Sequence, residues 1–240
     1  MAKVSEKDIA SIMKFIRERK CFPTVTRFQY TPVDMEYSLS MIETIGKYRN
    51  PKFRIDNENR FVYENIIRWL HGDPEMKCLS PDNRAIVAGN LNHGIYIAGN
   101  TGTGKSWCMD VISTYAQSRE MAIEIGGQKH ALAWGGWRAD VITGNFQLNG
   151  DYFDMAKRPI LYIQDLGSEQ SETMYMGNRV NVLRSILEYR GDRTDKLTLV
   201  TSNLPMQHKS FIEKYGDRVA SRMREMCNYF ELTGQDRRKL

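Results

Sequence analysis

The octapeptide GNTGTGKS at residues 99–106 constrains this chain more than any other feature. It is a complete G-x-x-x-x-G-K-[ST] motif, preceded by the strand-like run 95–98 and followed by a helical pattern. In this context glycines let the backbone wrap around a phosphate, while a helix N-terminus and Lys105 attract its charge. We therefore expect a nucleotide site in which Ser106 also ligates Mg²⁺. The expected nucleotide-binding residues are Gly99, Asn100, Thr101, Gly102, Thr103, Gly104, Lys105, Ser106 and Trp107.

Short apolar runs alternate with helical patterns from residue 94 onward, in the order IYIA, KSWCMDVISTYAQ, ILYI, VNVLRSILEY and LTLVTS. Such alternation is typical of parallel sheets, because a crossover between parallel strands usually contains a helix. We therefore predict an α/β fold in which helices cover a parallel sheet.

The first 52 residues show helical patterns but no chemical motif. Ser5-x-x-Asp8 has the spacing of a capping box, and an apolar stripe follows at helical spacing: Ile9, Ile12, Met13 and Ile16. This stripe fits either a core or the groove of another protein. Residues 21–32 contain two prolines and are typical of a loop or linker, with further helices expected over 34–48 and 57–70. We predict a helical region over 1–52 and a core over 53–240.

Composition narrows the class of protein without naming a partner. The 240 residues are 41% hydrophobic, and 34 basic against 29 acidic residues give a net charge of +5, which excludes a disordered tail and permits an anionic ligand. No apolar run approaches the roughly 20 residues of a membrane span, and the N-terminus lacks an apolar signal region, so we expect a cytoplasmic protein without membrane association. The four cysteines are far apart and predict isolated thiols.

A second chemical site is predicted at residues 160–169, ILYIQDLGSE, where an apolar run ends in polar residues. P-loop ATPases need an acidic group at such a strand end for Mg²⁺, and often a second carboxylate that orients the attacking water. If the strand ends after four residues, Gln164 takes the metal position and Asp165 orients the water, which we favour. If it extends one residue further, Asp165 serves the metal and Glu169 the water. A neutral Gln164 predicts slow or Mg²⁺-demanding turnover.

The chain resembles the DnaC/DnaI/IstB-like AAA+ ATPases, which include replicative helicase loaders and transposition helper ATPases. Four blocks carry the resemblance, at residues 94–100 leading into the P-loop, at 164–167 (QDLG), at 199–204 (LVTSNL) and at 215–223 (YGDRVASRM). The resemblance covers about residues 53–240 and implies an AAA+ type P-loop fold that binds and hydrolyses ATP with Mg²⁺. Few residues follow the last predicted strand, so no full C-terminal lid domain is expected. The family's usual first Walker B acid is Gln164 here.

Further site residues follow from the same resemblance. Asn203 matches the sensor 1 residue, which helps to place the attacking water near the terminal phosphate. Arg222, with Arg218 as its companion, matches an arginine finger that reaches the nucleotide of an adjacent subunit; the alternative is a basic helix face in solvent or on DNA. Arg237 or Arg238 resembles the family's last arginine, a sensor 2 equivalent.

The resemblance also implies partners. A DnaC-like loader would form an ATP-dependent homo-oligomer, bind single-stranded DNA, and grip a replicative helicase through its N-terminal region. Basic clusters at 157–158, 190–193, 218–224 and 237–239 are candidates for DNA contact.

Three alternatives stay open beside the loader. An IstB-like ATPase would engage a transposase instead of a helicase, and Gln164 is compatible with a nucleotide-gated scaffold that hydrolyses little ATP. A small-molecule P-loop kinase is the third, although it would not need the paired arginines at 218 and 222.

Overall fold

The computed structural model describes residues 5–19, 21–27 and 30–237. The helices are α1 Glu6–Arg19, α2 Met35–Arg49, α3 Arg60–His71, α4 Lys105–Ser118, α5 Ala139–Asn149, α6 Phe153–Lys157, α7 Val182–Gly191, α8 Lys209–Tyr215 and α9 Asp217–Met226. The strands are β1 Val25–Thr26, β2 Lys77–Leu79, β3 Ile86–Ala88, β4 Gly94–Ala98, β5 Ala122–Ile125, β6 Gln128–Ala131, β7 Gly136–Arg138, β8 Ile160–Leu166, β9 Thr173–Tyr175, β10 Asn178–Val180, β11 Leu197–Ser202 and β12 Cys227–Glu231.

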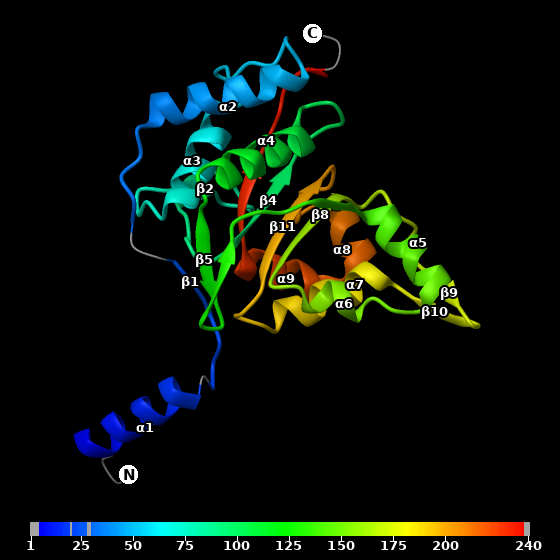
Figure 1. Ribbon diagram of the computed structural model, residues 1–240. Helices are drawn as coiled ribbons and strands as arrows, with labels where there is room; N and C mark the ends of the chain where they lie inside the picture. The colour runs from blue at the N-terminus through cyan, green and yellow to red at the C-terminus, as the bar shows by residue number, and fades with distance from the viewer. Residues whose placement is uncertain (1–4, 20, 28–29, 238–240) are drawn as a thin grey trace.

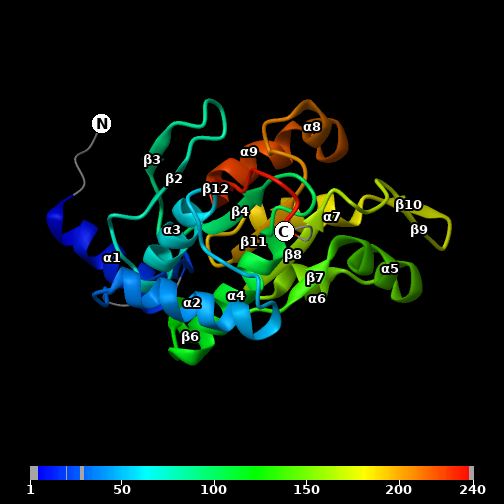
Figure 2. The ribbon, with the colours of Figure 1, turned by 90° about the horizontal axis from the view of Figure 1, so that it is seen from above.

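A seven-stranded sheet in the order β3-β2-β12-β4-β11-β8-β7 forms the centre of the molecule (Figure 1). The five strands from β12 to β7 are parallel, and β2 and β3 extend one edge as antiparallel strands. The predicted parallel sheet is therefore confirmed. Strand β11 lies between β4 and β8, so the carboxyl ends of these three strands open side by side at one edge of the sheet, seen from above in Figure 2.

Helices cover both faces of the sheet, because successive side chains of a strand point to opposite faces. Ile95 and Ile97 of β4 pack in one core with α2, α3 and α4, whereas Tyr96 and Ala98 pack in a second core with the helices from α5 to α9. All four side chains are buried, as expected for a parallel strand covered on both sides. The result is a three-layer α/β fold of the predicted class.

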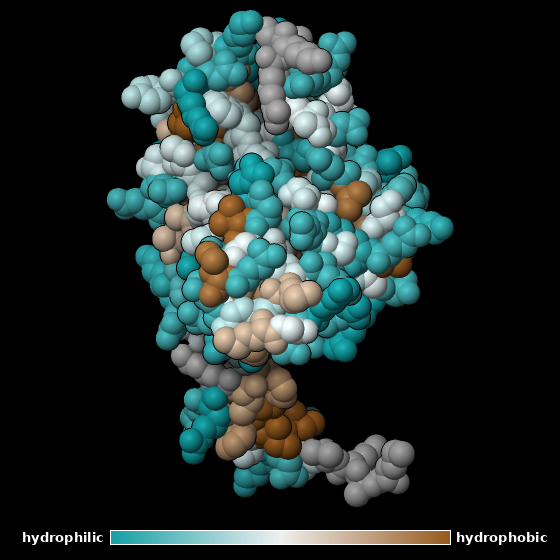
Figure 3. Space-filling model, turned by 90° about the vertical axis from the view of Figure 1, so that its right-hand side faces the viewer, coloured by the Kyte–Doolittle hydropathy of each residue, from teal (hydrophilic) through white to brown (hydrophobic). Residues whose placement is uncertain are grey.

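Helix α1 projects away from this three-layer body (Figure 1). The predicted capping box forms: Ser5 Oγ accepts a hydrogen bond from the Asp8 amide at 3.2 Å and donates one to the Asp8 carboxylate at 2.6 Å. Ile9, Ile12 and Met13 are 50%, 53% and 44% exposed. The apolar stripe thus lies uncovered in the described chain, and Figure 3 shows apolar side chains gathered over α1.

Helix α2 begins at Met35, one residue after the predicted start, and its N-cap Asp34 accepts a hydrogen bond from the Tyr37 amide at 3.0 Å. Its side chains Leu39 and Ile42 are buried in the same core as α3 and α4. The boundary predicted near residue 52 therefore separates elements that share one core, and the division into two regions stays a prediction.

The stretch 21–32 is more than a linker, which corrects the sequence-based expectation. Val25 and Thr26 form β1, which pairs antiparallel with β5, and Val25 is only 4% exposed. The amide of Val25 also donates a 2.8 Å hydrogen bond to the Thr194 carbonyl. Long-range pairing thus fixes a segment whose local sequence predicts a loop.

Arg190 is a structural residue rather than a candidate for DNA contact, which corrects the prediction for the 190–193 cluster. Its guanidinium is fully buried and donates hydrogen bonds to Thr198 Oγ1 and to the carbonyls of Ala156, Arg158 and Leu197, at 2.6 to 3.0 Å. Burial lowers the pKa of Arg190 to about 9. These contacts join the end of α6 to the start of β11.

No helix within the described ranges is both long and apolar enough to cross a bilayer. The four cysteines are free thiols, of which Cys21 is exposed and the others are buried. Beyond β11 the described chain, up to residue 237, contains α8, α9 and β12, without a helical lid domain.

Candidate nucleotide site

The predicted phosphate loop connects β4 to α4. Gly102 and Gly104 have φ angles of +85° and +93°, a left-handed conformation that glycine adopts without the strain of a Cβ atom. Gly104 is the N-cap of α4 and has no side chain that could accept a hydrogen bond from the helix's first amides. These amides and the positive end of the helix are thus available to an anion.

Lys105 lies in the mouth of the loop. Its side chain is buried, and Nζ donates 2.8 Å hydrogen bonds to the carbonyls of Gly99 and Asn100 and to Asn203 Oδ1. The Asn203 amide in turn donates to Thr101 Oγ1 at 3.2 Å. The structure therefore brings the predicted P-loop lysine and the predicted sensor 1 asparagine, from adjacent strand ends, into direct contact.

A β-bulge shapes the end of β8. The pairing with β11 shifts between Val200 and Ser202, so that Gln164 and Asp165 together oppose Thr201. Asp165 has a left-handed φ of +55°, and its amide donates to Thr201 Oγ1 at 3.2 Å. A bulge changes the alternation of side chains, and both Gln164 and Asp165 line the same cleft. Left-handed backbone at a non-glycine residue carries strain and is concentrated at functional sites.

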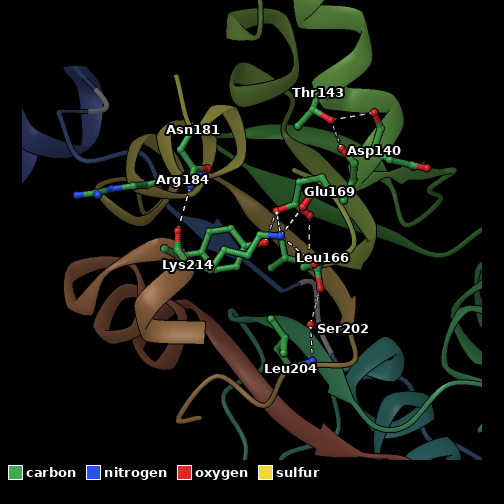
Figure 4. Close-up of polar contacts among 12 residues, drawn as sticks. Asp140, Thr143, Leu166, Glu169, Asn181, Arg184, Ser202, Leu204 and Lys214 are labelled. Carbon is green, nitrogen blue, oxygen red and sulfur yellow. Dashed lines mark hydrogen bonds and ion pairs between the residues drawn. The ribbon is translucent and has the colours of Figure 1, made fainter. Parts of the chain in front are cut away.

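Glu169 is not among the residues that line this cleft, and Figure 4 shows it beside Lys214. Its buried carboxylate accepts hydrogen bonds from the Gly167 amide at 2.9 Å and from Tyr215 Oη at 2.5 Å, and lies 3.2 Å from Lys214 Nζ. Lys214 also donates to the carbonyls of Gly167 and Glu169. Glu169 thus ties the turn after β8 to α8, and the structure does not bring it to the other predicted site residues.

The cleft above the strand ends has a volume of about 950 Å³, near the upper end of the roughly 300–1,000 Å³ typical of ligand sites. Among the described residues, six basic and two acidic side chains line it. Phe53, Tyr63 and Trp107 form an aromatic side next to the P-loop, with Phe53 and Trp107 ring centroids 6.1 Å apart. The cleft therefore combines a cationic half, suited to phosphates, with an aromatic half.

The donor set suits one Mg²⁺ ion. Ser106, Gln164 and Asp165 all line the cleft and offer hydroxyl, amide and carboxylate oxygens, the ligand types that Mg²⁺ prefers. Asp110, one helical turn after Ser106, adds a second carboxyl group, whose pKa is raised by burial. Sequence reasoning missed Asp110, although its spacing of four residues from Ser106 places both on one helix face.

Arg138 is a further lining residue that the sequence did not reveal. It ends the edge strand β7 opposite Gln164 in the parallel register, and its guanidinium makes two hydrogen bonds to Asp140, at 3.0 and 2.9 Å. Only the pairing of β7 with β8 identifies it, because its local sequence, GWRAD, contains no site motif.

The two predicted finger arginines lie outside this cleft. Arg218 and Arg222 share a face of α9, and each pairs at 3.0 Å with Asp192, the C-cap of α7. Helix α9 ends where β12 begins, at the edge of the sheet opposite the P-loop. Neither arginine is therefore among the residues that line the cleft of its own chain.

The chain's last described residues fold back over the P-loop. The Arg237 amide donates to the Gly102 carbonyl at 2.9 Å, and its guanidinium makes two hydrogen bonds to the Asp56 carboxylate, at 2.9 and 2.8 Å. Arg237 lines the cleft while its charge is directed to Asp56. The alternative sensor 2 candidate, Arg238, lies outside the described residues.

Comparison with known proteins identifies the fold. No protein-family model matches the chain, and no curated protein matches it significantly. A candidate primosome component from Streptococcus pyogenes serotype M3 superposes with a TM-score of 0.50 and 18% identity, over 80% of this chain and 90% of that one. The DnaC helicase loader superposes with a TM-score of 0.50 and 13% identity, over 82% of this chain and 99% of the loader.

The chain has a DnaC-like fold. The predicted resemblance to DnaC-like AAA+ proteins is confirmed at the level of the fold, because the similarity extends over nearly the whole loader. The DnaC-like fold also agrees with the position of the cleft, at the carboxyl ends of parallel strands where ligands bind in open α/β sheets. Identities of 18% and 13% leave the chemistry of the site to be argued from the residues themselves.

Proposed function

We propose that the protein is an ATP-dependent helicase loader in which the cleft binds ATP with Mg²⁺. The observation that carries the proposal is the convergence of Lys105, Asn203 and the Gln164–Asp165 bulge at adjacent strand ends. Two solved structures that share this fold, a helicase loader and a candidate primosome component, support the loader role. A turn with a structural role alone would not need its lysine to contact the neighbouring strand end, as Lys105 contacts Asn203.

The cationic half of the cleft suits the phosphates of a nucleotide, and the aromatic half suits its base. The amides at the start of α4 donate to the phosphates, and Lys105 exchanges its bonds to the loop carbonyls for the outer phosphates. The aromatic side formed by Phe53, Tyr63 and Trp107 takes the base. Nε1 of Trp107 is buried without a hydrogen-bond partner in the described chain and offers a donor on that side.

Hydrolysis in this cleft would use Asp165 and Asn203 to orient the attacking water. Asp165 accepts a hydrogen bond from the water, and Asn203 both donates and accepts between the water and the terminal phosphate. Ser106, Gln164 and Asp165 would hold Mg²⁺, which neutralises charge on the phosphate oxygens when bound. Because Gln164 is uncharged, we expect slow turnover with a high Mg²⁺ requirement.

A neighbouring subunit would complete the ATP site. Arg218 and Arg222 cannot serve their own cleft from the opposite edge of the sheet, but a second copy can present them. Asp192 pairs both arginines in the isolated chain, so assembly would exchange this carboxylate for ATP phosphates. ATP binding and oligomerisation are then coupled.

The exposed apolar stripe of α1 is the proposed binding surface for the helicase. Ile9, Ile12 and Met13 form an amphipathic face that no described part of the chain covers, as helix-in-groove recognition requires. Single-stranded DNA is the further proposed ligand, and its contacts would come from basic residues other than the buried Arg190.

A pull-down with purified replicative helicase and transposase candidates, with and without ATP, tests the loader role. We expect ATP-dependent capture of the helicase by the wild type and loss of capture for Ile12→Asp. Leu148→Asp, at another highly exposed apolar position, is the matched control and should leave capture unchanged. Capture of the transposase alone would contradict the loader role and favour an IstB-like function.

A nucleotide-gated scaffold is the second candidate, and the neutral Gln164 at the metal position favours it. Such a scaffold binds ATP and assembles without significant hydrolysis. Steady-state ATPase assays with single-stranded DNA separate the two functions. Turnover that Asp165→Ala abolishes would exclude the scaffold, whereas ATP-dependent assembly without turnover would support it.

A further inference from the structure

A second cavity, of about 310 Å³, lies between the ends of α3 and α4 and the β5–β6 hairpin. Its lining includes Arg27, His71, Arg119, Glu120 and Lys129. No described residue lines both this cavity and the nucleotide cleft. A ligand in this cavity would therefore be separate from a nucleotide in the cleft.

Arg27 is the unusual member of this lining. Its Nε donates a 2.7 Å hydrogen bond to the Leu91 carbonyl, and its guanidinium carbon lies 4.1 Å from the centroid of the Trp69 ring. These contacts fix the guanidinium, yet Nη1 and Nη2 are buried without a hydrogen-bond partner in the described chain. Burial lowers the pKa of Arg27 to about 9, so the group is charged at neutral pH.

A buried charge with unsatisfied donors is costly and normally has an anionic partner. None of the described carboxylates forms an ion pair with Arg27, Arg119 or Lys129. Glu120 is the one acidic residue of the described lining, and burial lowers the pKa of His71, which is then neutral at pH 7. The lining thus carries two more positive than negative charges.

Helix ends explain only part of this charge. Because α3 and α4 both end here, their partial negative charge favours nearby cations and accounts for the exposed Arg119 and Lys129. It does not account for Arg27, whose terminal nitrogens bond to none of the carbonyls at these helix ends. A ligand with paired acceptor oxygens would satisfy both terminal nitrogens at once.

We propose that this cavity binds a phosphate group, which accepts hydrogen bonds from Nη1 and Nη2 of Arg27 and is neutralised by Arg119 and Lys129. Two excess positive charges match a phosphate dianion better than a single carboxylate. The planar guanidinium presents its two terminal nitrogens to two phosphate oxygens at once, which lysine cannot do. The phosphate comes either from a free phosphate ester or from the backbone of single-stranded DNA. The proposal does not depend on the function of the nucleotide cleft.

Titration with inorganic phosphate by ³¹P NMR tests the site in the full-length Lys105→Ala protein, in which the P-loop lysine is absent. We expect saturable 1:1 binding that Arg27→Gln weakens at least about tenfold and Arg27→Lys weakens less. Arg179→Gln is the matched control, because Arg179 lies on the β9–β10 hairpin, away from the cavity, and pairs with Glu172. Its phosphate affinity should equal that of the parent protein.

Two outcomes would overturn the proposal: absence of saturable phosphate binding, or unchanged affinity in a folded Arg27→Gln protein. If Arg27→Gln does not fold, the double variant Arg119→Gln/Lys129→Gln replaces it, since both residues are exposed, and unchanged affinity would again contradict the site. Competition distinguishes the sources of the phosphate. Displacement by an oligonucleotide without terminal phosphates supports the DNA backbone, and displacement by a nucleoside monophosphate alone supports a phosphate ester.

Discussion

At the scale of single residues, the bulge at Gln164 and Asp165 decides how the site is built. A regular strand would direct consecutive side chains to opposite faces, but the extra residue opposite Thr201 lets both line the cleft. Glu169, the alternative carboxylate, instead accepts a hydrogen bond from Tyr215 and forms an ion pair with Lys214. Strand β8 extends to Leu166, beyond both of the strand ends considered from the sequence. The assignment of Gln164 to the metal and Asp165 to the water therefore stays a proposal.

Replacing Gln164 with Asp tests this arrangement. The added carboxylate should bind Mg²⁺ more tightly, so the Mg²⁺ concentration for half-maximal ATPase activity falls about tenfold, or turnover rises. Glu169→Gln is the control: it should lower the thermal midpoint of unfolding, because it weakens a buried network, while the Mg²⁺ requirement stays unchanged. Lower turnover in a folded Glu169→Gln protein, without effect of Gln164→Asp, would favour the Asp165/Glu169 arrangement.

At the scale of elements, the sequence predicted the helices and strands that are defined by a local sequence pattern. Helices α2 and α3 and strands β4, β8 and β11 lie within a few residues of their expected positions, because caps, the P-loop and apolar runs define them. Strand β1 and the bulge after Ile163 were not predictable, since distant partners create both. Arg190 was assigned to the surface for the same reason: only the fold places four acceptors around it.

The C-terminal segment over the P-loop should respond to acid. Hydrogen bonding to Arg237 lowers the pKa of Asp56, so this carboxylate stabilises the docked segment at neutral pH. Because the pKa is lowered in the folded state, that stabilisation is lost as the pH falls below about 4 and through the folded-state value. The protection of the Arg237 amide, whose N–H donates to Gly102, should then fall relative to the intrinsic exchange rate at the same pH.

Asp56→Asn should accelerate the exchange of the Arg237 amide already at pH 7. The amide of Val200, in the centre of β11, is the internal reference and should stay protected in both proteins. Equal protection of the Arg237 amide at pH 7 and pH 3, with Val200 protected throughout, would contradict a role for this ion pair.

At the scale of the whole molecule, the sheet separates the two halves of the proposed ATP site. The cleft opens at the carboxyl edge of the strands, and α9 with Arg222 meets β12 at the other edge. Under the proposed function, an isolated chain would hold the nucleotide but lack its arginine finger. A complete site would then require two copies, which would couple ATP binding to assembly.

Mixing two inactive variants tests this division. Lys105→Ala should bind ATP about 100-fold more weakly. Arg222→Ala should lose about 10³-fold or more in turnover, the usual effect of removing an arginine finger. In mixed oligomers, Lys105 of one subunit faces Arg222 of the other, so ATPase activity should return. Activity that stays absent in oligomers shown to be mixed would indicate that Arg222 does not act across the interface.

Calorimetric titration of Mg²⁺·ATP into the wild type and Lys105→Ala tests the central claim, that the cleft is an ATP site, most directly. Lys105→Ala should bind about 100-fold more weakly, since about 3 kcal/mol of charge-assisted hydrogen bonding to the phosphates is lost. Lys209→Ala, at a highly exposed lysine of α8, should bind ATP like the wild type. Equal ATP affinity of a folded Lys105→Ala protein and the wild type would contradict the account.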